Sequence, residues 1–239
     1  MRHGESVNNA LEGAPDYLSA RDSEPDLTDY GRKQAERTAE FIAGKLGNGE
    51  ITPPESAHNP YSGAGFGITH IYSSPHLRAL RTAAPTADSL ALPVTVYEDI
   101  HEAGGVFEYD AHREVFVGAS GLSKRHALSL YETIEYPNHL PDDGWWGARP
   151  MEDEHSRMAR AARVREYVLA NHEAQDHVLF VSHCHFYVYF MCEVLGIPYR
   201  EGLWFTLNNC ALTRITFDHR GVRVDYQNRQ DYLYPSLLG

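Results

Sequence analysis

Residues 71–83 read Ile-Tyr-Ser-Ser-Pro-His-Leu-Arg-Ala-Leu-Arg-Thr-Ala and are the strongest indication of the fold. Residues 68–73 are typical of a buried strand, and the Ser-Pro pair after them indicates a turn. Pro75 suits the first turn of a following helix, where its missing N–H costs nothing. Arg78 would then lie near a helix start, where free N–H groups and the helix dipole attract anions. The stretch therefore predicts a strand, a turn and a helix, with a helix start that favours the binding of an anion.

The rest of the chain continues the alternation of strands and helices. Residues 178–182 are typical of a strand covered on both faces of a parallel sheet. The other predicted elements are a short strand over 94–97, an antiparallel hairpin over 211–217 and 222–227, and helices starting at Thr28 as N-cap and over 152–172. Together they predict one α/β domain over residues 1–239, with three layers (α/β/α) and a mostly parallel central sheet.

Three segments show no clear period. Residues 7–26 contain glycine and prolines among polar residues and predict a loop. Residues 47–67 exceed the ~4–6 residues of a typical connection and predict a surface insertion or a flap. Residues 106–150 are the least regular, and their aromatic side chains either pack the segment onto the sheet or contact a ligand. Both interpretations stay open for these aromatics, which are Phe107, Tyr109, Phe116, Tyr131, Tyr136, Trp145 and Trp146.

Composition narrows the class of protein. The chain has 239 residues, 42% of them hydrophobic, which is enough for one buried core. A formal charge of −12 argues against a nucleic-acid or anionic-membrane partner, although a local pocket can still be positive. No run is long enough to span a bilayer and no signal-peptide pattern is present. Three cysteines without paired spacing favour a reducing compartment, and we expect a cytoplasmic protein.

Arginines and histidines occur at the ends of predicted elements. The chain opens with Arg-His-Gly at residues 2–4, Asn9 follows, and the last predicted parallel strand ends at His183. A phosphoryl group carries several charged oxygens, so its site needs guanidinium forks, neutral donors and a group that attacks phosphorus. With Arg78, the chain has two arginines, two histidines and an asparagine for these tasks. We therefore expect a phosphate-handling site.

These motifs, in this order, resemble those of the histidine phosphatase superfamily, whose fold is called phosphoglycerate-mutase-like. The resemblance extends from residue 2 to about the last predicted strand. It implies that His3 is the nucleophile and that Arg2 and Arg78 clamp the phosphoryl oxygens. It also implies that Asn9 donates to the phosphate, although a loop-capping role stays open for this residue. His183 matches the second family histidine, which donates a hydrogen bond to the phosphoryl group from the far side.

The family's acid corresponds to Glu102, within Ile-His-Glu-Ala-Gly-Gly at residues 100–105. A carboxyl group there would protonate the leaving group and then activate water against the phosphohistidine. Other carboxylates compete for this role, namely Glu98, Asp99 and Glu108. After His183 the family usually has glycines, whereas this chain has Cys184 followed by His185. We interpret Cys184 as a packing residue and note that His185 could be mistaken for the functional histidine.

The resemblance has two further consequences. In related phosphatases an excursion at the position of residues 106–150 covers the active site, so we expect the same of this insertion. The family carries its Arg-His-Gly at the end of a central strand, whereas only Met1 precedes it here. A strand before Arg2 is therefore expected to be missing, and a chain that starts at Met1 should be less stable.

Metal and nucleotide motifs are absent from the sequence. Its fourteen histidines include no His-Glu-x-x-His, and there is no Cys-x-x-Cys, Walker loop or dinucleotide fingerprint. His183 and His185 would point apart if both lay on a strand. We therefore predict no metal and no cofactor.

The resemblance implies a metal-independent phosphomonoester hydrolase that acts on a small phosphorylated substrate through a phosphohistidine on His3. A phosphoglycerate mutase would use the same residues, and the scarcity of basic residues in the insertion favours hydrolysis. Those basic residues are Arg113, Lys124, Arg125 and Arg149. A non-catalytic domain that binds a phosphorylated ligand or dimerises is a third interpretation, and a homodimer stays open.

Overall fold

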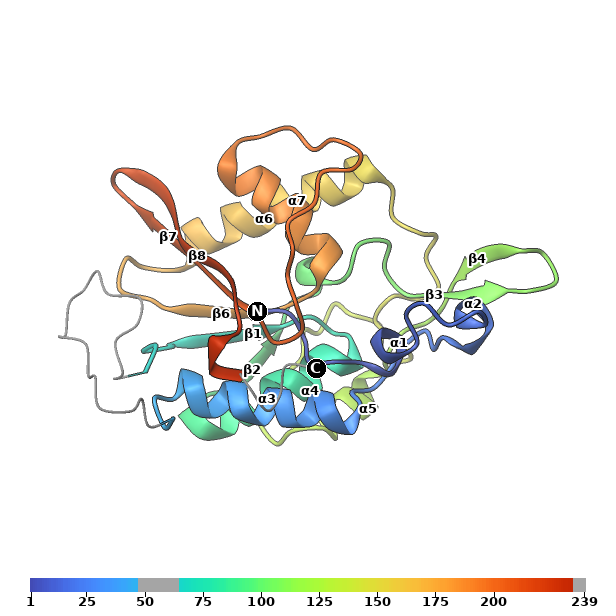
Figure 1. Cartoon of the computed structure of the whole chain (residues 1–239), viewed down its shortest axis with the longest axis horizontal. Helices are drawn as coiled ribbons and strands as arrows, with labels where there is room; N and C mark the ends of the chain where they lie inside the picture. Colours follow the sequence, from blue (N-terminus) through green and yellow to red (C-terminus); the bar gives the residue numbers. More distant parts are fainter. Residues whose placement is uncertain (47–64, 234–239) are drawn as a thin grey trace.

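A computed structural model describes residues 1–46 and 65–233 of the chain. Its centre is a sheet of four parallel strands in the order β5-β2-β1-β6 (Figure 1). The strands are β1 (His70–Ser73), β2 (Val94–Val96), β5 (Ile134–Glu135) and β6 (Val178–Val181). The strands predicted over 68–73, 94–97 and 178–182 are confirmed with slightly shorter bounds.

Helices cover both faces of this sheet (Figure 1). One face carries α3 (Asp29–Ile42) and α4 (Leu77–Leu90), and the other carries α6 (Glu154–Asn171) and α7 (Cys184–Leu195). Thr28 caps α3 as predicted, because its hydroxyl oxygen accepts from the Gly31 N–H at 3.0 Å. The expected three-layer α/β/α fold with a parallel central sheet is confirmed.

Two segments predicted to be irregular contain short regular elements. Residues 7–26 form two single-turn helices, α1 (Val7–Ala10) and α2 (Tyr17–Ala20), rather than a continuous loop. Residues 106–150 contain an antiparallel pair, β3 (Phe107–Asp110) and β4 (Val115–Gly118), the helix α5 (Lys124–Leu128) and the sheet strand β5. Elements of two to five residues are too short to produce a readable hydrophobic period, so sequence patterns miss them.

The 3₁₀ turn η1 (Glu98–Ile100) follows β2. After α7 come the predicted antiparallel hairpin, β7 (Leu212–Asp218) with β8 (Gly221–Arg229), and the 3₁₀ turn η2 (Asp231–Leu233). The connection predicted over 47–67 lies outside the described residues except for its last three. Among the residues that the structure describes, no helix is long and apolar enough to cross a membrane.

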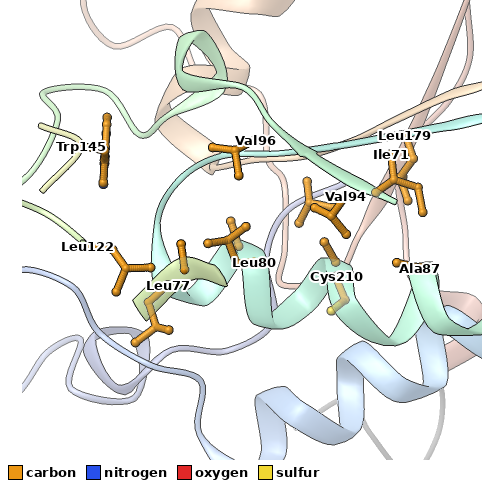
Figure 2. Close-up of a cluster of buried hydrophobic side chains, with 14 of the residues drawn as sticks. Ile71, Leu77, Leu80, Ala87, Val94, Val96, Leu122, Trp145, Leu179 and Cys210 are labelled. Carbon is orange, nitrogen blue, oxygen red and sulfur yellow. The ribbon is translucent and has the colours of Figure 1, made fainter. Parts of the chain in front are cut away.

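The larger core cluster lies between the sheet and α4 (Figure 2). Ile71 and Val94 of the sheet pack toward Leu80 of α4, and each of these side chains is at most 2% exposed. At one end of the cluster lie Trp145 and Trp146 of the insertion, which are 1% and 5% exposed. For these two tryptophans the packing interpretation is therefore the correct one.

The first three residues lie beside β6. Arg2 pairs in parallel with Ser182, whose N–H donates to the Met1 carbonyl at 2.9 Å and whose carbonyl accepts from the His3 N–H at 3.0 Å. On their other side, the Cys210 N–H donates to the Arg2 carbonyl at 3.1 Å. This ladder places His3 at the carboxyl edge of the central sheet.

A close contact between two glycines holds the turn after His3 against α3. A Cβ atom on Gly4 would lie 2.5 Å from the Gly31 carbonyl oxygen, and one on Gly31 would lie 2.0 Å from the Glu5 carbonyl oxygen. Both distances are too short for any side chain, so the glycine of the opening tripeptide is a packing requirement.

Arg160 of α6 holds the loop that carries Glu102. Its guanidinium donates to both carboxylate oxygens of Glu152, at 2.8 and 2.7 Å, and to the carbonyls of Asp99 and His101, at 2.7 and 2.9 Å. The Arg160 side chain is 2% exposed, so these bonds are shielded from water. The same helix carries an exposed pair, Arg163 with Asp99.

We expect Arg160→Met to lower the free energy of unfolding by ~3–5 kcal/mol, because it leaves the Glu152 carboxylate buried without a partner. The matched control, Arg163→Met, should cost less than ~1 kcal/mol because its pair is exposed to solvent. Urea denaturation of the three proteins measures both values. Equal losses in the two variants would contradict the assigned role of Arg160.

Candidate active site

Three predicted site residues meet at the carboxyl ends of the central strands. His3 follows the ladder beside β6, Arg78 is the second residue of α4, and His183 is the N-cap of α7. Ligands of α/β proteins bind at this edge of the sheet. The ring centroids of His3 and His183 are 5.1 Å apart, and Arg78 Nε is 3.2 Å from His3 Nε2.

The His3 ring is held in one tautomer. Its Nδ1 donates to the Gly4 carbonyl oxygen at 2.7 Å, so Nδ1 carries the proton and Nε2 keeps a lone pair, which accepts from Arg78 Nε. Burial lowers the pKa of His3 well below its ordinary value, and the positive charges of Arg78 and Arg2 lower it further. His3 is therefore a neutral imidazole whose Nε2 is available as a nucleophile.

The guanidinium groups of Arg78 and Arg2 lie near His3. Arg78 is buried, and its Nη1 lies 3.3 Å from His76 Nδ1. Arg2 Nη1 donates to the Leu207 carbonyl at 2.9 Å, while its Nε is buried without a hydrogen-bond partner. A buried donor without a partner is costly, and an anion would satisfy it.

α4 begins at Leu77, so Pro75 precedes the helix rather than occupying its first turn as predicted.

His183 lies beside the His3 ring, with the two ring planes tilted by 54°. Its Nε2 is 2.9 Å from the Ser74 hydroxyl, and its Nδ1 is buried without a partner. Burial lowers the pKa of His183 well below its ordinary value, and Arg78 and His76 act in the same direction. The ring is thus neutral and retains one nitrogen for a ligand.

Glu102 approaches the site from the loop after η1 and caps α7. One carboxylate oxygen accepts from the N–H groups of Ala103 and Phe186, at 2.8 and 3.1 Å. The other lies 3.5 Å from His185 Nδ1 and 3.8 Å from Cys184 Sγ. His185 therefore lies in the first turn of α7 beside Glu102, not on a strand with His183, and Cys184 contacts the carboxylate.

Charges around Glu102 decide its protonation. Burial by itself would raise the pKa of Glu102, but His185 and Arg78 lower it below the usual range. In turn, Cys184 and Glu102 raise the pKa of His185 to about 10. Without a bound ligand the pair is a carboxylate beside an imidazolium.

The competing carboxylates are engaged elsewhere. Asp99 pairs with Arg163 at 2.9 Å, and Glu98 pairs with His139 at 2.5 Å. Glu108 is exposed on β3. Of the four carboxylates considered from sequence, Glu102 is the one that the structure places near Arg78 and His3.

Asn9 takes a capping position rather than a clear donor position. Its side-chain oxygen accepts from the Ser6 N–H at 3.2 Å in a capping box, and its amide nitrogen donates to Glu12 at 2.9 Å. Asn209, which no sequence pattern indicated, links Asn9 to His3. Its amide nitrogen donates to the Asn9 side-chain oxygen and to the His3 carbonyl, both at 3.1 Å.

Glu24, which no sequence pattern indicated, anchors the insertion to the site. Its carboxylate accepts from Trp145 Nε1 at 2.9 Å and from the Leu77 N–H at 3.2 Å, and it lies 3.1 Å from His76 Nδ1. Burial would raise the pKa of Glu24, but His76 and Arg78 lower it overall. Glu24 lies in the segment predicted as a loop, where no pattern marks it.

Comparison with known proteins gives matches of two kinds. A sequence model described as histidine phosphatase superfamily (branch 1) matches residues 61–230. A phosphoserine phosphatase from Entamoeba histolytica is 20% identical with a TM-score of 0.56, covering 97% of this chain and 96% of that chain. A mycobacterial glucosyl-3-phosphoglycerate phosphatase is 17% identical with a TM-score of 0.56, covering 96% of each chain. None of the curated proteins matches the chain.

These structural similarities show the fold, and the sequence match shows the family. The match spans more than half of the chain and includes the strand-turn-helix of Arg78, the Glu102 loop and His183. Together with the parallel sheet and the assembled histidine site, it identifies the chain as a member of the histidine phosphatase superfamily.

Proposed function

We propose that the chain is a phosphatase that hydrolyses phosphomonoesters through a phosphohistidine on His3. The observation that carries the proposal is the state of His3, a buried neutral imidazole whose Nε2 lone pair faces the Arg78 guanidinium. If a phosphoryl group binds between His3 and Arg78, His3 Nε2 gives up its hydrogen bond from Arg78 and forms a bond to phosphorus instead. Membership of the family and the fold shared with solved phosphatases support the same reaction class.

The first chemical step needs a nucleophile, a clamp and an acid. His3 Nε2 attacks phosphorus, the bond from phosphorus to the ester oxygen breaks, and that oxygen takes a proton from Glu102. Arg2 and Arg78 stabilise the charge of the transferring group, and His183 Nδ1 offers a further donor. Because guanidinium groups supply this positive charge, the reaction requires no metal ion.

The second step reverses the role of the acid. Glu102, now ionised, takes a proton from water, which attacks the phosphohistidine and releases phosphate and neutral His3. The lowered pKa of Glu102 keeps it ionised, as a base must be. A bound phosphate dianion adds negative charge near Glu102 and raises its pKa, which allows the acid role in the first step.

We infer a small phosphorylated substrate. Structures that share the fold include a phosphoserine phosphatase in complex with phosphoserine and a glucosyl-3-phosphoglycerate phosphatase in complex with inorganic phosphate. In this chain the insertion over 106–150 is fixed beside the phosphate site through Trp145 and Glu24, which supports the role of this segment as a cover. The three cysteines are unpaired, consistent with the proposed cytoplasmic location.

The scarcity of free basic residues in the insertion favours hydrolysis over a mutase. Arg113 pairs with Asp110, and Lys124 pairs with Asp142. Arg149 stacks on the ring of Trp146. These three of the four basic residues thus have partners within the insertion, which supports hydrolysis. The intact nucleophile, clamp and acid argue against a purely binding domain.

With p-nitrophenyl phosphate as substrate and EDTA present, we expect phosphate release by the chain and a loss of about 10³-fold or more in kcat for His3→Ala. His126→Ala, an exposed histidine on α5, is the matched control and should keep full activity. Isomerisation of a phosphoglycerate without phosphate release would favour the mutase instead. A folded chain inactive in both assays would reject catalysis.

The His185 charge generates a prediction on pH dependence. In His185→Gln the imidazolium beside Glu102 is gone, so the pKa of Glu102 rises and the acid stays protonated to higher pH. We expect the alkaline limb of the kcat profile to move up by about one pH unit or more, because loss of one close charge has about this effect. An unchanged profile, with His126→Gln as control, would show that Glu102 is not the acid.

A further inference from the structure

A second cluster of metal-binding side chains lies at the opposite edge of the central sheet. His70 begins β1, His172 follows the last residue of α6, and Asp176 lies in the turn before β6. These elements meet at the amino ends of the strands, whereas the phosphate site lies at the carboxyl ends (Figure 1). One nitrogen of each histidine and a carboxylate oxygen lie within 4.8 Å of one another. The cluster is therefore separate from the site described above.

The state of His172 is the independent indication of a ligand. Its side chain is 5% exposed, and both ring nitrogens are buried without a hydrogen-bond partner. Its closest charged atom is Asp176 Oδ2, 3.5 Å from Nδ1, beyond good hydrogen-bond geometry. A buried imidazole with two unsatisfied nitrogens is costly, and a metal ion bound to one of them would remove part of this cost.

The surrounding groups orient the cluster. His70 Nδ1 is 2.9 Å from the Thr69 hydroxyl, which leaves Nε2 for a metal, as is usual for metal-binding histidines. The His172 ring packs edge-on against His70, with centroids 4.7 Å apart, and against Tyr72 at 5.6 Å. Asp176 Oδ2, the oxygen nearest His172 Nδ1, accepts from the Glu173 N–H at 3.0 Å and keeps a second lone pair for a metal. Each side chain thus has one atom able to coordinate an ion.

We propose that His70, His172 and Asp176 bind a divalent transition metal ion of the zinc type, with water as a fourth ligand. Two imidazoles and one carboxylate are a ligand set found around Zn²⁺, with bonds of about 2.0–2.1 Å. Ligand atoms around such an ion are roughly 3.3 Å apart, so a modest closure of the present cluster is needed. The ion would tie the end of α6 to the starts of β1 and β6, which is a structural role.

An access route agrees with this site. His172 and Asp176 also line a cavity of about 580 Å³ between β6 and β7, which offers an entry path. The sequence predicted no metal because His70 is about a hundred residues from the His-x-x-x-Asp pair.

The described residues contain one other cluster that could bind the same ion, namely Glu102, Cys184 and His185 at the phosphate site. The test therefore uses the full chain carrying His185→Gln, freed of metal with EDTA. Zn²⁺ alone is titrated by calorimetry, and Co²⁺ is added separately as a spectroscopic probe. We expect one Zn²⁺ per chain, a rise in Tm, and a cobalt spectrum without a thiolate charge-transfer band.

Removal of a ligand should weaken this binding selectively. His172→Gln and, in case that buried variant does not fold, His70→Gln and Asp176→Asn should each lower Zn²⁺ affinity at least about tenfold and abolish the rise in Tm. His126→Gln is the control and should bind as the parent does. Phosphatase activity of Asp176→Asn should be unchanged, because the site does not take part in the reaction. Absence of stoichiometric binding, or equal binding by all variants, would overturn the proposal.

Discussion

The parallel pairing of Arg2 with Ser182 is the constraint on which the site depends. It places His3 beside His183 at the end of the sheet, while the Cys210 backbone holds the same residues from the other side. The glycine contact with α3 fixes the following turn, and the Gly4 carbonyl in that turn selects the His3 tautomer. The proposed nucleophile is thus positioned by backbone geometry rather than by a mobile side chain.

The second feature of the site is its balance of buried charge. Burial, together with the neighbouring guanidinium groups, keeps the His3 imidazole neutral, and buried carboxylates at two helix starts compensate those guanidinium groups. Glu24 accepts from the first N–H of α4, and Glu102 accepts from the third N–H of α7. Each carboxylate is stabilised by the helix end that it caps. In this way a protein with a formal charge of −12 can maintain the pocket that we propose for a phosphate.

The sequence predicted the parts of the site that follow a regular strand. His183 comes just after β6, and Arg78 lies in the first turn of the helix that follows β1, so the parallel sheet brings both to one edge. Glu24 and Asn209 could not be predicted, because they reach the site from irregular segments through hydrogen bonds that have no period. β5 was missed for a related reason, since two residues joined to a sheet by pairing with β2 show no pattern of their own.

Trapping the covalent intermediate tests the central claim most directly. The chain would be mixed with a phosphomonoester, quenched in alkali during turnover, digested and analysed by mass spectrometry. Our account predicts an acid-labile, alkali-stable phosphoryl group on the peptide that contains His3, and its absence from unreacted chain. Steady turnover with no phosphoryl group on His3, or with the group on another residue, would contradict it.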